Sequence, residues 1–321
     1  MKVLLVTNMY PSKEFPTYGI FVKEQQSAIE RYHRDVEFIV FYINGKLGMM
    51  EYLKSILRIN QLIKRNNFDL IHIHYGLSGL FLLSRLSLKV PVLVTLHGGD
   101  IQVEQGKKVQ VFLTKQILKC AQMAVTLNAR MDSITKKYIK NTVLVPCSVN
   151  TEIFVPKKEI KPSSSVKRIV FPSDRSRMVK NYPLFEEVIK LLKSKYNINC
   201  ETFEVKNMNR QQVADLYNSA DLMLMTSISE GSPQVVKEAM ACNLPVVSTN
   251  VGDVEVLLAN VQGSAVSKSG SAEELAGLCY KSLCGDFNGI KGRDKIFELE
   301  LDDKNIATKV YNIYKSLSRH K

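Results

Sequence analysis

The stretch Glu230-Gly-Ser-Pro-Gln-Val-Val-Lys-Glu238 decides how the second half of the chain folds. An apolar run at residues 221–227 precedes it and another at 245–249 follows it, so both flanks are predicted to be buried strands. The stretch itself is then the turn and the first helical turns of a β-α-β unit. Ser232 is expected to cap this helix and Pro233 to be its first residue, which is a favoured order.

The residue types in this turn indicate a ligand site. Free N–H groups at the start of the helix, with the flexible Gly231 before them, form a site for an anion. Glu230 lies at the mouth of the turn, and the side chain of Glu238 leans back toward it from just off the edge of the buried face. Backbone donors for phosphate and two carboxylate acceptors for sugar hydroxyls predict a nucleotide-sugar pocket. The alternative is an ordinary capped helix with solvated glutamates.

The chain of 321 residues is long enough for two domains, because single cores rarely grow beyond about 250 residues. Its apolar content of 45% and charged content of 23% are typical of soluble globular proteins. No apolar run reaches the length of a membrane span, and residues 1–7 enter a strand without a signal-peptide pattern. The six cysteines lack C-x-x-C pairs and zinc-ligand spacing, so we expect free thiols in a reducing cytoplasm.

Positive charge is concentrated in the first half of the chain. The net charge is +13, and the first 150 residues contain 20 Lys and Arg against 10 Asp and Glu. Nucleic acid, an anionic membrane surface and an anionic saccharide are all partners that this charge suits. No aromatic and basic platform for nucleic acid is present. The amphipathic basic segment 52–65 either packs on a sheet or touches anionic lipid.

Strand and helix patterns alternate along the whole chain, which predicts two doubly wound parallel sheets. In the first half, strands are expected at 3–7, 36–42, 69–74, 91–96, 123–127 and 143–145, with helices at 19–34, 52–65, 77–88, 109–119 and 130–140. In the second half, strands are expected at 168–172, 201–205, 222–226 and 245–249, with helices at 183–195, 210–218, 233–242, 254–258, 272–283 and 305–317.

The predicted elements divide into two domains joined by a linker. Residues 1–155 form the N-terminal domain, and residues 167–302 form the C-terminal domain. The segment 156–166 is polar and rich in Pro and Ser, which is typical of a linker. The last segment, 303–321, is expected to be a helix that braces the two domains.

Ligands of doubly wound sheets bind beyond the carboxyl ends of the strands. At that edge of the first domain, Gly19 opens a helix, where it either lets a phosphate or acceptor approach or is a plain loop glycine. His97 follows the fourth strand and is able to orient a substrate, although a histidine satisfied by local backbone is the alternative. His72 and His74 face the same side of one strand, as a metal pair or as a polar rim.

Three cations follow the first strand of the second domain, namely Arg175, Arg177 and Lys180. Their loop leads from a buried strand to a helix, so it lies at the same edge of the sheet as the Glu230 turn. Charge-assisted bonds to a diphosphate contribute about 1.5–3 kcal/mol each. These side chains therefore predict a diphosphate site, and a solvated basic loop is the alternative.

Taken together, these motifs resemble glycosyltransferase family 4, which comprises retaining group 1 glycosyltransferases with the GT-B fold. The stretch from Glu230 to Glu238 is similar to the family's E-x7-E pattern, and segments 69–79, 95–100, 145–154 and 216–222 look like other family segments. The resemblance covers most of the chain. It implies two Rossmann-like α/β domains facing a cleft, with the N-terminal domain on the acceptor side and the C-terminal domain binding the donor.

The resemblance also implies a role for each candidate residue. Glu230 would bind hydroxyls of the donor sugar, and Glu238 would bind the ribose. Lys180, with Arg175 or Arg177, would neutralise the diphosphate, so that the catalytic set comprises His97, Glu230 and Lys180. Gly19 would line the acceptor and phosphate loop. The backbone that would hold sugar or phosphate belongs to Gly231, Ser232, Pro233, Gln234 and Val235.

Two departures from the family pattern concern the phosphate loop. The usual Gly-Arg pair before the lysine is replaced by Pro172-Ser-Asp-Arg175-Ser-Arg177, so either arginine is a candidate. The residue after Lys180 is Asn181, where glycine is common in the family.

The expected function is metal-independent retaining transfer of a sugar from a nucleoside-diphosphate sugar to a saccharide or lipid-linked saccharide, in the synthesis of cell-surface polysaccharide or glycoconjugate. No D-x-D motif offers a magnesium site, so no metal or other cofactor is expected. The protein is expected in the cytoplasm, either free or held at the cytoplasmic face of the membrane by its basic N-terminal domain. Nucleic acid is not an expected partner. The alternatives are a nucleotide-sugar epimerase or hydrolase on the same fold, and a non-catalytic protein that binds nucleotide sugars or polyanions.

Overall fold

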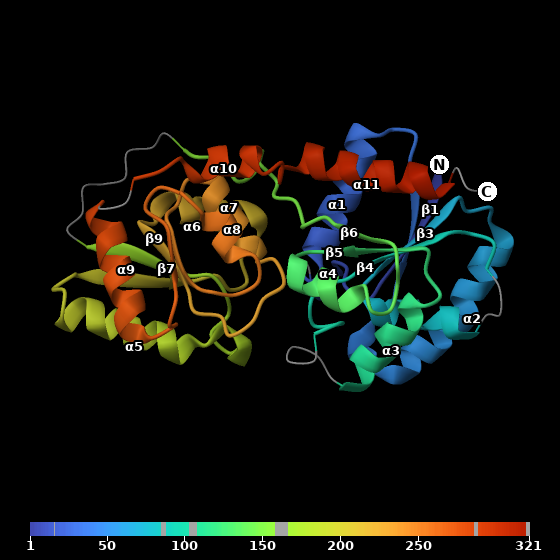
Figure 1. The fold of residues 1–321 in the computed structure, drawn as a ribbon, viewed down its shortest axis with the longest axis horizontal. Coiled ribbons are helices and arrows are strands. Elements are labelled where there is room, and N and C mark those ends of the chain that lie inside the picture. Colours follow the sequence, from blue (N-terminus) through green and yellow to red (C-terminus); the bar gives the residue numbers. More distant parts are fainter. Residues whose placement is uncertain (16, 85–87, 103–107, 158–165, 286–287, 319–321) are drawn as a thin grey trace. The chain divides into compact units, whose positions relative to one another are not determined.

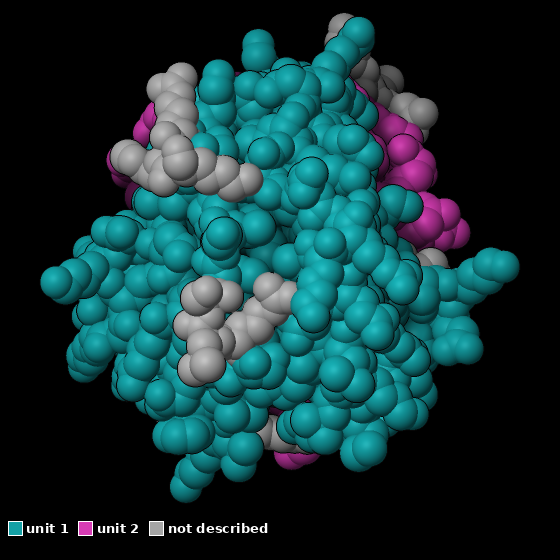
Figure 2. Space-filling view, turned by 90° about the vertical axis from the view of Figure 1, so that its right-hand side faces the viewer, with its two compact units in different colours: residues 1–148, 303–321 teal, residues 149–302 magenta. Residues whose placement is uncertain are grey.

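Alternating strands and helices form two separate units, each built on one parallel sheet (Figures 1 and 2). The structure is a computed structural model, and it describes residues 1–15, 17–84, 88–102, 108–157, 166–285 and 288–318. Unit 1 comprises Met1–Ser148 and Asp303–Lys321, and unit 2 comprises Val149–Asp302. The C-terminal segment therefore returns to the first unit.

The sheet of unit 1 has the order β2-β1-β3-β4-β5-β6, and all neighbouring strands are parallel. Strands β1, β3, β4 and β5 are almost wholly buried, which explains their near-continuous apolar sequences. The strands are β1 (Lys2–Thr7), β2 (Glu37–Tyr42), β3 (Leu70–His74), β4 (Val92–Thr95), β5 (Met123–Thr126) and β6 (Thr142–Leu144).

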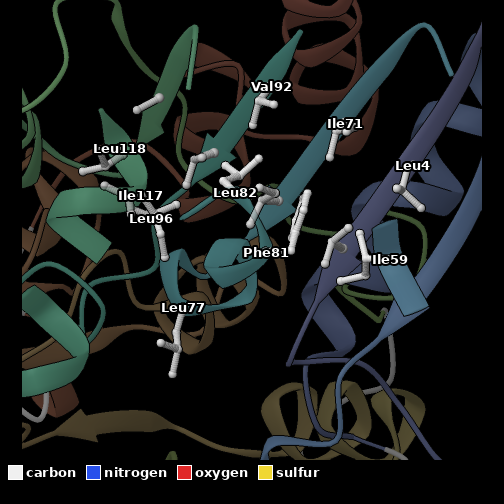
Figure 3. Packing of buried hydrophobic residues seen from close by; sticks show 14 of the residues in the cluster. Leu4, Ile59, Ile71, Leu77, Phe81, Leu82, Val92, Leu96, Ile117 and Leu118 are labelled. Carbon is white, nitrogen blue, oxygen red and sulfur yellow. The ribbon is translucent and has the colours of Figure 1, made fainter. Parts of the chain in front are cut away.

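Helices cover both faces of this sheet. Helices α1 and α11 pack against each other on one face, and α2, η2 and α3 lie on the other (Figure 1). The helical elements of unit 1 are α1 (Ile20–Tyr32), η1 (Gly45–Leu47), α2 (Met49–Arg65), η2 (Gly76–Ser84), α3 (Lys108–Leu118), α4 (Ala129–Thr135) and α11 (Asp303–Ser318). Figure 3 shows Phe81 of η2 and Ile59 of α2 among the buried side chains of this core.

Unit 2 repeats the architecture with the strand order β11-β10-β9-β7-β8, again all parallel. Its strands are β7 (Lys167–Phe171), β8 (Cys200–Glu204), β9 (Leu222–Met225), β10 (Val246–Thr249) and β11 (Ala265–Ser267). Its helical elements are η3 (Met178–Lys180), α5 (Tyr182–Ser194), α6 (Arg210–Ser219), α7 (Gln234–Ala241), α8 (Val254–Leu258), α9 (Ala272–Cys284) and α10 (Gly292–Glu298).

All ten strands predicted from the sequence are present, each with ends within one residue of the expected position. The helix predicted over 77–88 is instead the 3-10 element η2, which packs closely on α3. A Cβ at Gly76 would lie 2.2 Å from Thr114, and one at Gly79 would lie 2.6 Å from Ile117. Strand β11 and helix α10 were missed, because elements this short show no clear periodicity.

Three further expectations concern the linker, the C-terminal helix and membrane spans. The predicted linker, 156–166, falls mostly on residues 158–165, which lie outside the described residues. The predicted C-terminal helix is present as α11 and packs on α1 and β3 of unit 1. None of the helices in the described part of the chain combines the length and the apolarity that a membrane span requires.

Phe81 provides a test of the core of unit 1, because it is 1% exposed in the middle of the buried cluster. Phe81→Ala should lower the free energy of unfolding of unit 1 by about 3–5 kcal/mol, since it removes a buried aromatic ring and leaves a cavity. Leu83→Ala in the same element is the matched control, because Leu83 is 42% exposed and should cost at most about 0.5 kcal/mol. Urea unfolding curves of both variants measure the difference, and equal losses would contradict this packing.

Candidate active site

Two loops of unit 2 meet where the strand order reverses, beside β7. Strand β7 lies between β8 and β9, so the loops that follow β7 and β9 leave the same edge of the sheet. The hydroxyl of Thr226 donates a hydrogen bond that is shared between the carbonyls of Lys180 and Asn181, each 3.0 Å away. The N–H of Ile228 donates to the carbonyl of Val179 at 2.9 Å. These bonds fix the two loops to each other.

As a result, Lys180 and Glu230 form an ion pair between Nζ and Oε1. The two residues are 50 positions apart in the chain, and their side chains are only 10% and 16% exposed. A cation for phosphate and an acceptor for hydroxyl groups thus lie side by side at the carboxyl edge of the sheet. Because each charge is largely withdrawn from water, each depends on the other for compensation.

Asn181 has a conformational role in this loop. Its backbone has φ 52° and ψ 55°, which is the left-handed region, and it precedes the first residue of α5. Glycine adopts this conformation most easily, and asparagine is among the few other residues that do so at low cost. Asparagine in place of the family's common glycine therefore preserves the turn that presents Lys180.

The two candidate arginines differ in how strongly other side chains of the protein hold them. Arg175 donates from Nε to Glu204 at 2.7 Å, and its guanidinium lies 5.3 Å from the ring centre of Tyr182. Arg177 is exposed, and its Nη1 makes a weak contact of 3.5 Å with the Ser173 hydroxyl. Arg177 is therefore the less engaged of the two.

The start of α7 differs from the sequence prediction. The helix begins at Gln234, and Pro233 occupies the cap position without a side-chain cap, so the prediction that Ser232 is the cap is wrong. The Ser232 hydroxyl instead donates to Asp253 at 2.6 Å. Asp253 is brought there by Gly252, whose φ is +63° and whose Cβ, if present, would lie 2.5 Å from the carbonyl oxygen of Gly231.

Glu238 is more buried than the sequence predicts. The residue is 2% exposed rather than at the edge of the buried face, and its Oε1 accepts a hydrogen bond of 2.7 Å from Arg210 of α6. The guanidinium of Arg210 also lies 4.6 Å from the ring centre of Phe154. Sequence analysis did not identify Arg210, because its partner is 28 residues away and no local motif connects them.

In unit 1, the loop after β4 is fixed by a buried carboxylate. Asp100 accepts the backbone N–H of His97 on Oδ1 and that of Gly76 on Oδ2, both at 3.0 Å. Burial raises the pKa of Asp100 to about 6, although four backbone hydrogen bonds act in the opposite direction. Asp100 was visible in the Gly-Gly-Asp motif, but the sequence alone did not indicate its role in fixing the backbone of His97.

Three histidines lie close together behind this loop. His74 Nδ1 is 3.1 Å from His97 Nε2. His72 contacts the Tyr314 hydroxyl through Nδ1 at 2.6 Å and the Thr95 hydroxyl through Nε2 at 2.7 Å. Because both nitrogens of His72 are occupied, the proposed metal pair with His74 is wrong. Both residues are also buried, and of the two it is His74 that lines a pocket, beside His97.

Gly19 is required by packing at the start of α1. Its φ is +66°, and a Cβ there would lie 2.2 Å from the carbonyl carbon of Met9. Two residues later, the ring of Phe21 lies 4.9 Å from that of His97, centre to centre. Phe21, His74 and His97 line a small pocket of unit 1. Gly19 therefore places α1 so that Phe21 reaches this pocket.

Comparisons with solved structures define the class of fold. Sucrose-phosphate synthase from Thermosynechococcus elongatus superposes with a TM-score of 0.81 at 17% identity, over 100% of this chain and 99% of the other. Anabaena HepE in complex with UDP superposes with a TM-score of 0.72 at 12% identity, over 98% of this chain and 100% of the other. With two parallel-sheet units of Rossmann type, the fold is GT-B, as the sequence predicts.

Sequence comparisons then give the family. The family described as glycosyl transferases group 1 matches residues 183–283, and the family described as glycosyl transferase 4-like matches residues 19–130. A teichuronic acid biosynthesis glycosyltransferase from Bacillus subtilis, TuaC, is 25% identical over 86% of this chain and 87% of its own length. The UDP-Gal:alpha-D-GlcNAc-diphosphoundecaprenol alpha-1,3-galactosyltransferase of Escherichia coli is 21% identical over 83% of each. Over these two segments and these relatives, the chain is similar to group 1 glycosyltransferases.

The buried His72 and His74 and the half-buried His97 predict that acid destabilises unit 1. Burial lowers the pKa of His72 and His97 to about 3, and lowers that of His74 well below its ordinary value. Between pH 6.5 and 3 the unfolded state thus binds more protons, so the free energy of unfolding falls as the pH falls. Each histidine lowers the free energy of unfolding by about 1.4 kcal/mol when the pH falls from 7.5 to 5.5. The raised pKa of Asp100 offsets only about 1 kcal/mol of this loss.

Hydrogen exchange of peptides from β3 and β4 at pH 7.5 and at pH 5.5 measures the free energy of unfolding of unit 1 directly. His97→Asn should reduce the pH-dependent loss by about 1.4 kcal/mol, because it removes one titrating ring. Leu83→Ala is the control, because it changes an exposed side chain of unit 1 and removes no titrating group. An unchanged pH dependence in His97→Asn would contradict the burial of His97 as a neutral ring.

Proposed function

We propose that the protein transfers a sugar from a nucleoside-diphosphate sugar to a saccharide or lipid-linked saccharide, with retention and without a metal ion, in cell-surface polysaccharide or glycoconjugate synthesis. The observation that carries this proposal is the Lys180–Glu230 pair at the carboxyl edge of the unit 2 sheet. The relatives support it, since one is described as a teichuronic acid enzyme, one as using UDP-Gal and a diphosphoundecaprenol-linked acceptor, and HepE holds UDP.

Lys180 and Arg177 are the proposed ligands of the diphosphate. Lys180 has a fixed position, and Arg177 is less engaged than Arg175, which is held by Glu204. A charge-assisted hydrogen bond contributes about 1.5–3 kcal/mol, whereas the end of a helix contributes about 0.3–1 kcal/mol. The cations therefore provide most of the affinity for the leaving group. The turn from Gly231 to Val235 adds backbone donors, except at Pro233, which has no N–H.

The glutamates and His97 are proposed to bind sugar hydroxyls. Glu230 accepts hydroxyls of the donor sugar, and Glu238 accepts those of the ribose, with Arg210 holding its carboxylate in place. His97 is neutral at pH 7 and contacts the donor sugar as donor or acceptor. Sugar transfer passes through a transition state of oxocarbenium character, so departure of the diphosphate needs electrostatic support more than a protein nucleophile.

The outer face of α2 is the proposed contact with an anionic membrane, where a lipid-linked acceptor would reside. The inner face of α2 packs in the core through Tyr52, Ile59 and Ile63. The outer face and the turn before it carry exposed apolar side chains among exposed lysines and arginines, the composition of a helix that lies on anionic lipid. The apolar residues are Leu47, Met49, Met50, Leu53 and Leu57, and the basic residues are Lys46, Lys54, Arg58, Lys64 and Arg65.

A panel of nucleoside-diphosphate sugars tests the proposed reaction, with and without saccharide and lipid-linked acceptors. We expect release of nucleoside diphosphate that depends on an acceptor, and a product with the anomeric configuration of the donor. Release without any acceptor would instead identify a hydrolase. Conversion of the donor sugar without release would identify an epimerase, and binding without turnover would identify a binding protein.

Within this assay, Lys180→Ala should lower the rate of transfer at least about tenfold, because a charge-assisted bond to the leaving group is lost. Lys180→Arg should retain part of the activity, since the positive charge remains. Lys190→Ala, an exposed lysine of α5, is the matched control. Thermal melting checks that each variant folds. A folded Lys180→Ala protein with normal turnover would remove Lys180 from the mechanism.

Liposome flotation tests the α2 surface. The double variant Leu53→Glu with Leu57→Glu should lose binding to vesicles that contain anionic phospholipid, because it places negative charge on the apolar face. Wild-type binding should weaken with added salt and be minimal on neutral vesicles. Val256→Glu is the control, since Val256 is 61% exposed on unit 2. Equal binding of the wild type and the double variant would exclude this surface.

A further inference from the structure

The side chain of His97 is held by two other residues of unit 1. Its Nε2 lies 3.1 Å from His74 Nδ1, and its ring packs against Phe21 with 4.9 Å between centres. Its backbone N–H is bound by Asp100. Ring and backbone are thus held independently, the ring by side chains of β3 and α1 and the backbone by a carboxylate of its own loop. This arrangement leaves Nδ1 as the ring nitrogen of His97 that makes no contact with His74.

The contact between the two histidines couples their protonation. Burial keeps both rings neutral, so each carries one proton, on Nδ1 or on Nε2. A hydrogen bond from His97 Nε2 to His74 Nδ1 requires both rings to carry their proton on Nε2. The reverse bond requires both to carry it on Nδ1. The geometry therefore excludes states in which one ring carries its proton on Nδ1 and the other on Nε2. As a result, the tautomer of His74 determines that of His97.

We propose that His74 is a positioning residue that fixes the tautomer and the ring orientation of His97. It thereby decides whether His97 Nδ1 accepts a hydrogen bond from a hydroxyl of the donor sugar or donates one to it. This role in catalysis rests on the proposed contact of His97 with the donor, whereas the coupling of the two rings does not.

His72 connects His74 to the C-terminal helix α11. The rings of His72 and His74 lie 4.2 Å apart, centre to centre, and His72 is itself held by the hydroxyls of Tyr314 and Thr95. Tyr314 belongs to α11, so the last helix of the chain stabilises the position of His74. A side chain held in this way loses little entropy when a ligand binds, which favours precise contacts.

Nitrogen NMR of the ¹⁵N-histidine-labelled protein without ligand tests the coupling. The chain has five histidines, so assignment by substitution is practical. We expect His74 and His97 to show the same single tautomer at pH 7. In His74→Leu the nitrogen shifts of His97 should move toward the average of the two tautomers. Opposite tautomers in the wild type, or unchanged His97 shifts in His74→Leu, would overturn the proposal.

Enzyme kinetics test the consequence for catalysis. His74→Leu should lower kcat about tenfold with a smaller change in KM, because His97 is present but misoriented. His74→Asn places an amide where Nδ1 lies, so it should recover kcat to within about threefold of the wild type. His33→Asn is the matched control. Equal kcat in His74→Leu and the wild type would overturn the catalytic part of the proposal. If kcat is unchanged but the NMR experiment shows the expected coupling, then the tautomer coupling stands and the proposed contact of His97 with the donor sugar is wrong.

Discussion

The hydroxyl of Thr226 bridges the carbonyls of Lys180 and Asn181, and the site in unit 2 depends on this bridge. Parallel pairing of β7 and β9 brings two loops to one edge, but pairing alone does not set the distance between their side chains. The bridge does so, because it ties the end of one strand to the turn that follows the other. The ion pair between Lys180 and Glu230 is a consequence of that constraint. A diphosphate would meet a cation whose position is set before binding.

Unit 1 uses a different means to place its functional groups. It holds three neutral histidines, of which His72 and His74 are buried and His97 is half-buried, together with a buried carboxylate. Hydrogen bonds link these groups to one another, to hydroxyls and to backbone N–H groups. Buried polar groups of this kind cost stability unless each finds a partner. Here the partners come from β3, β4 and α11, so the network fixes the loop after β4 at the expense of acid stability. Both units thus hold polar side chains rigidly at the carboxyl edge of a parallel sheet.

The sequence predicted the strands closely, because buried parallel strands are nearly continuous apolar runs and their ends are marked by polar residues. It also predicted that Lys180 and Glu230 share one edge, since the edge follows from strand direction alone. It failed where the contact is set by side chains distant in sequence. Arg210 beside Glu238 and Asp253 beside Ser232 are of this kind. The wrong helix cap at Ser232 has the same cause, because Asp253 binds the hydroxyl that the local pattern assigned to the helix.

The central claim is that Lys180, held beside Glu230, binds the diphosphate of the donor. The most direct measurement is the dissociation constant of the nucleoside diphosphate product, by calorimetry, for the wild type and for Lys180→Gln at low and high salt. The account predicts binding about tenfold weaker in Lys180→Gln at low salt, with a smaller loss of affinity on adding salt. Equal affinity of the two proteins at both salt concentrations would contradict it.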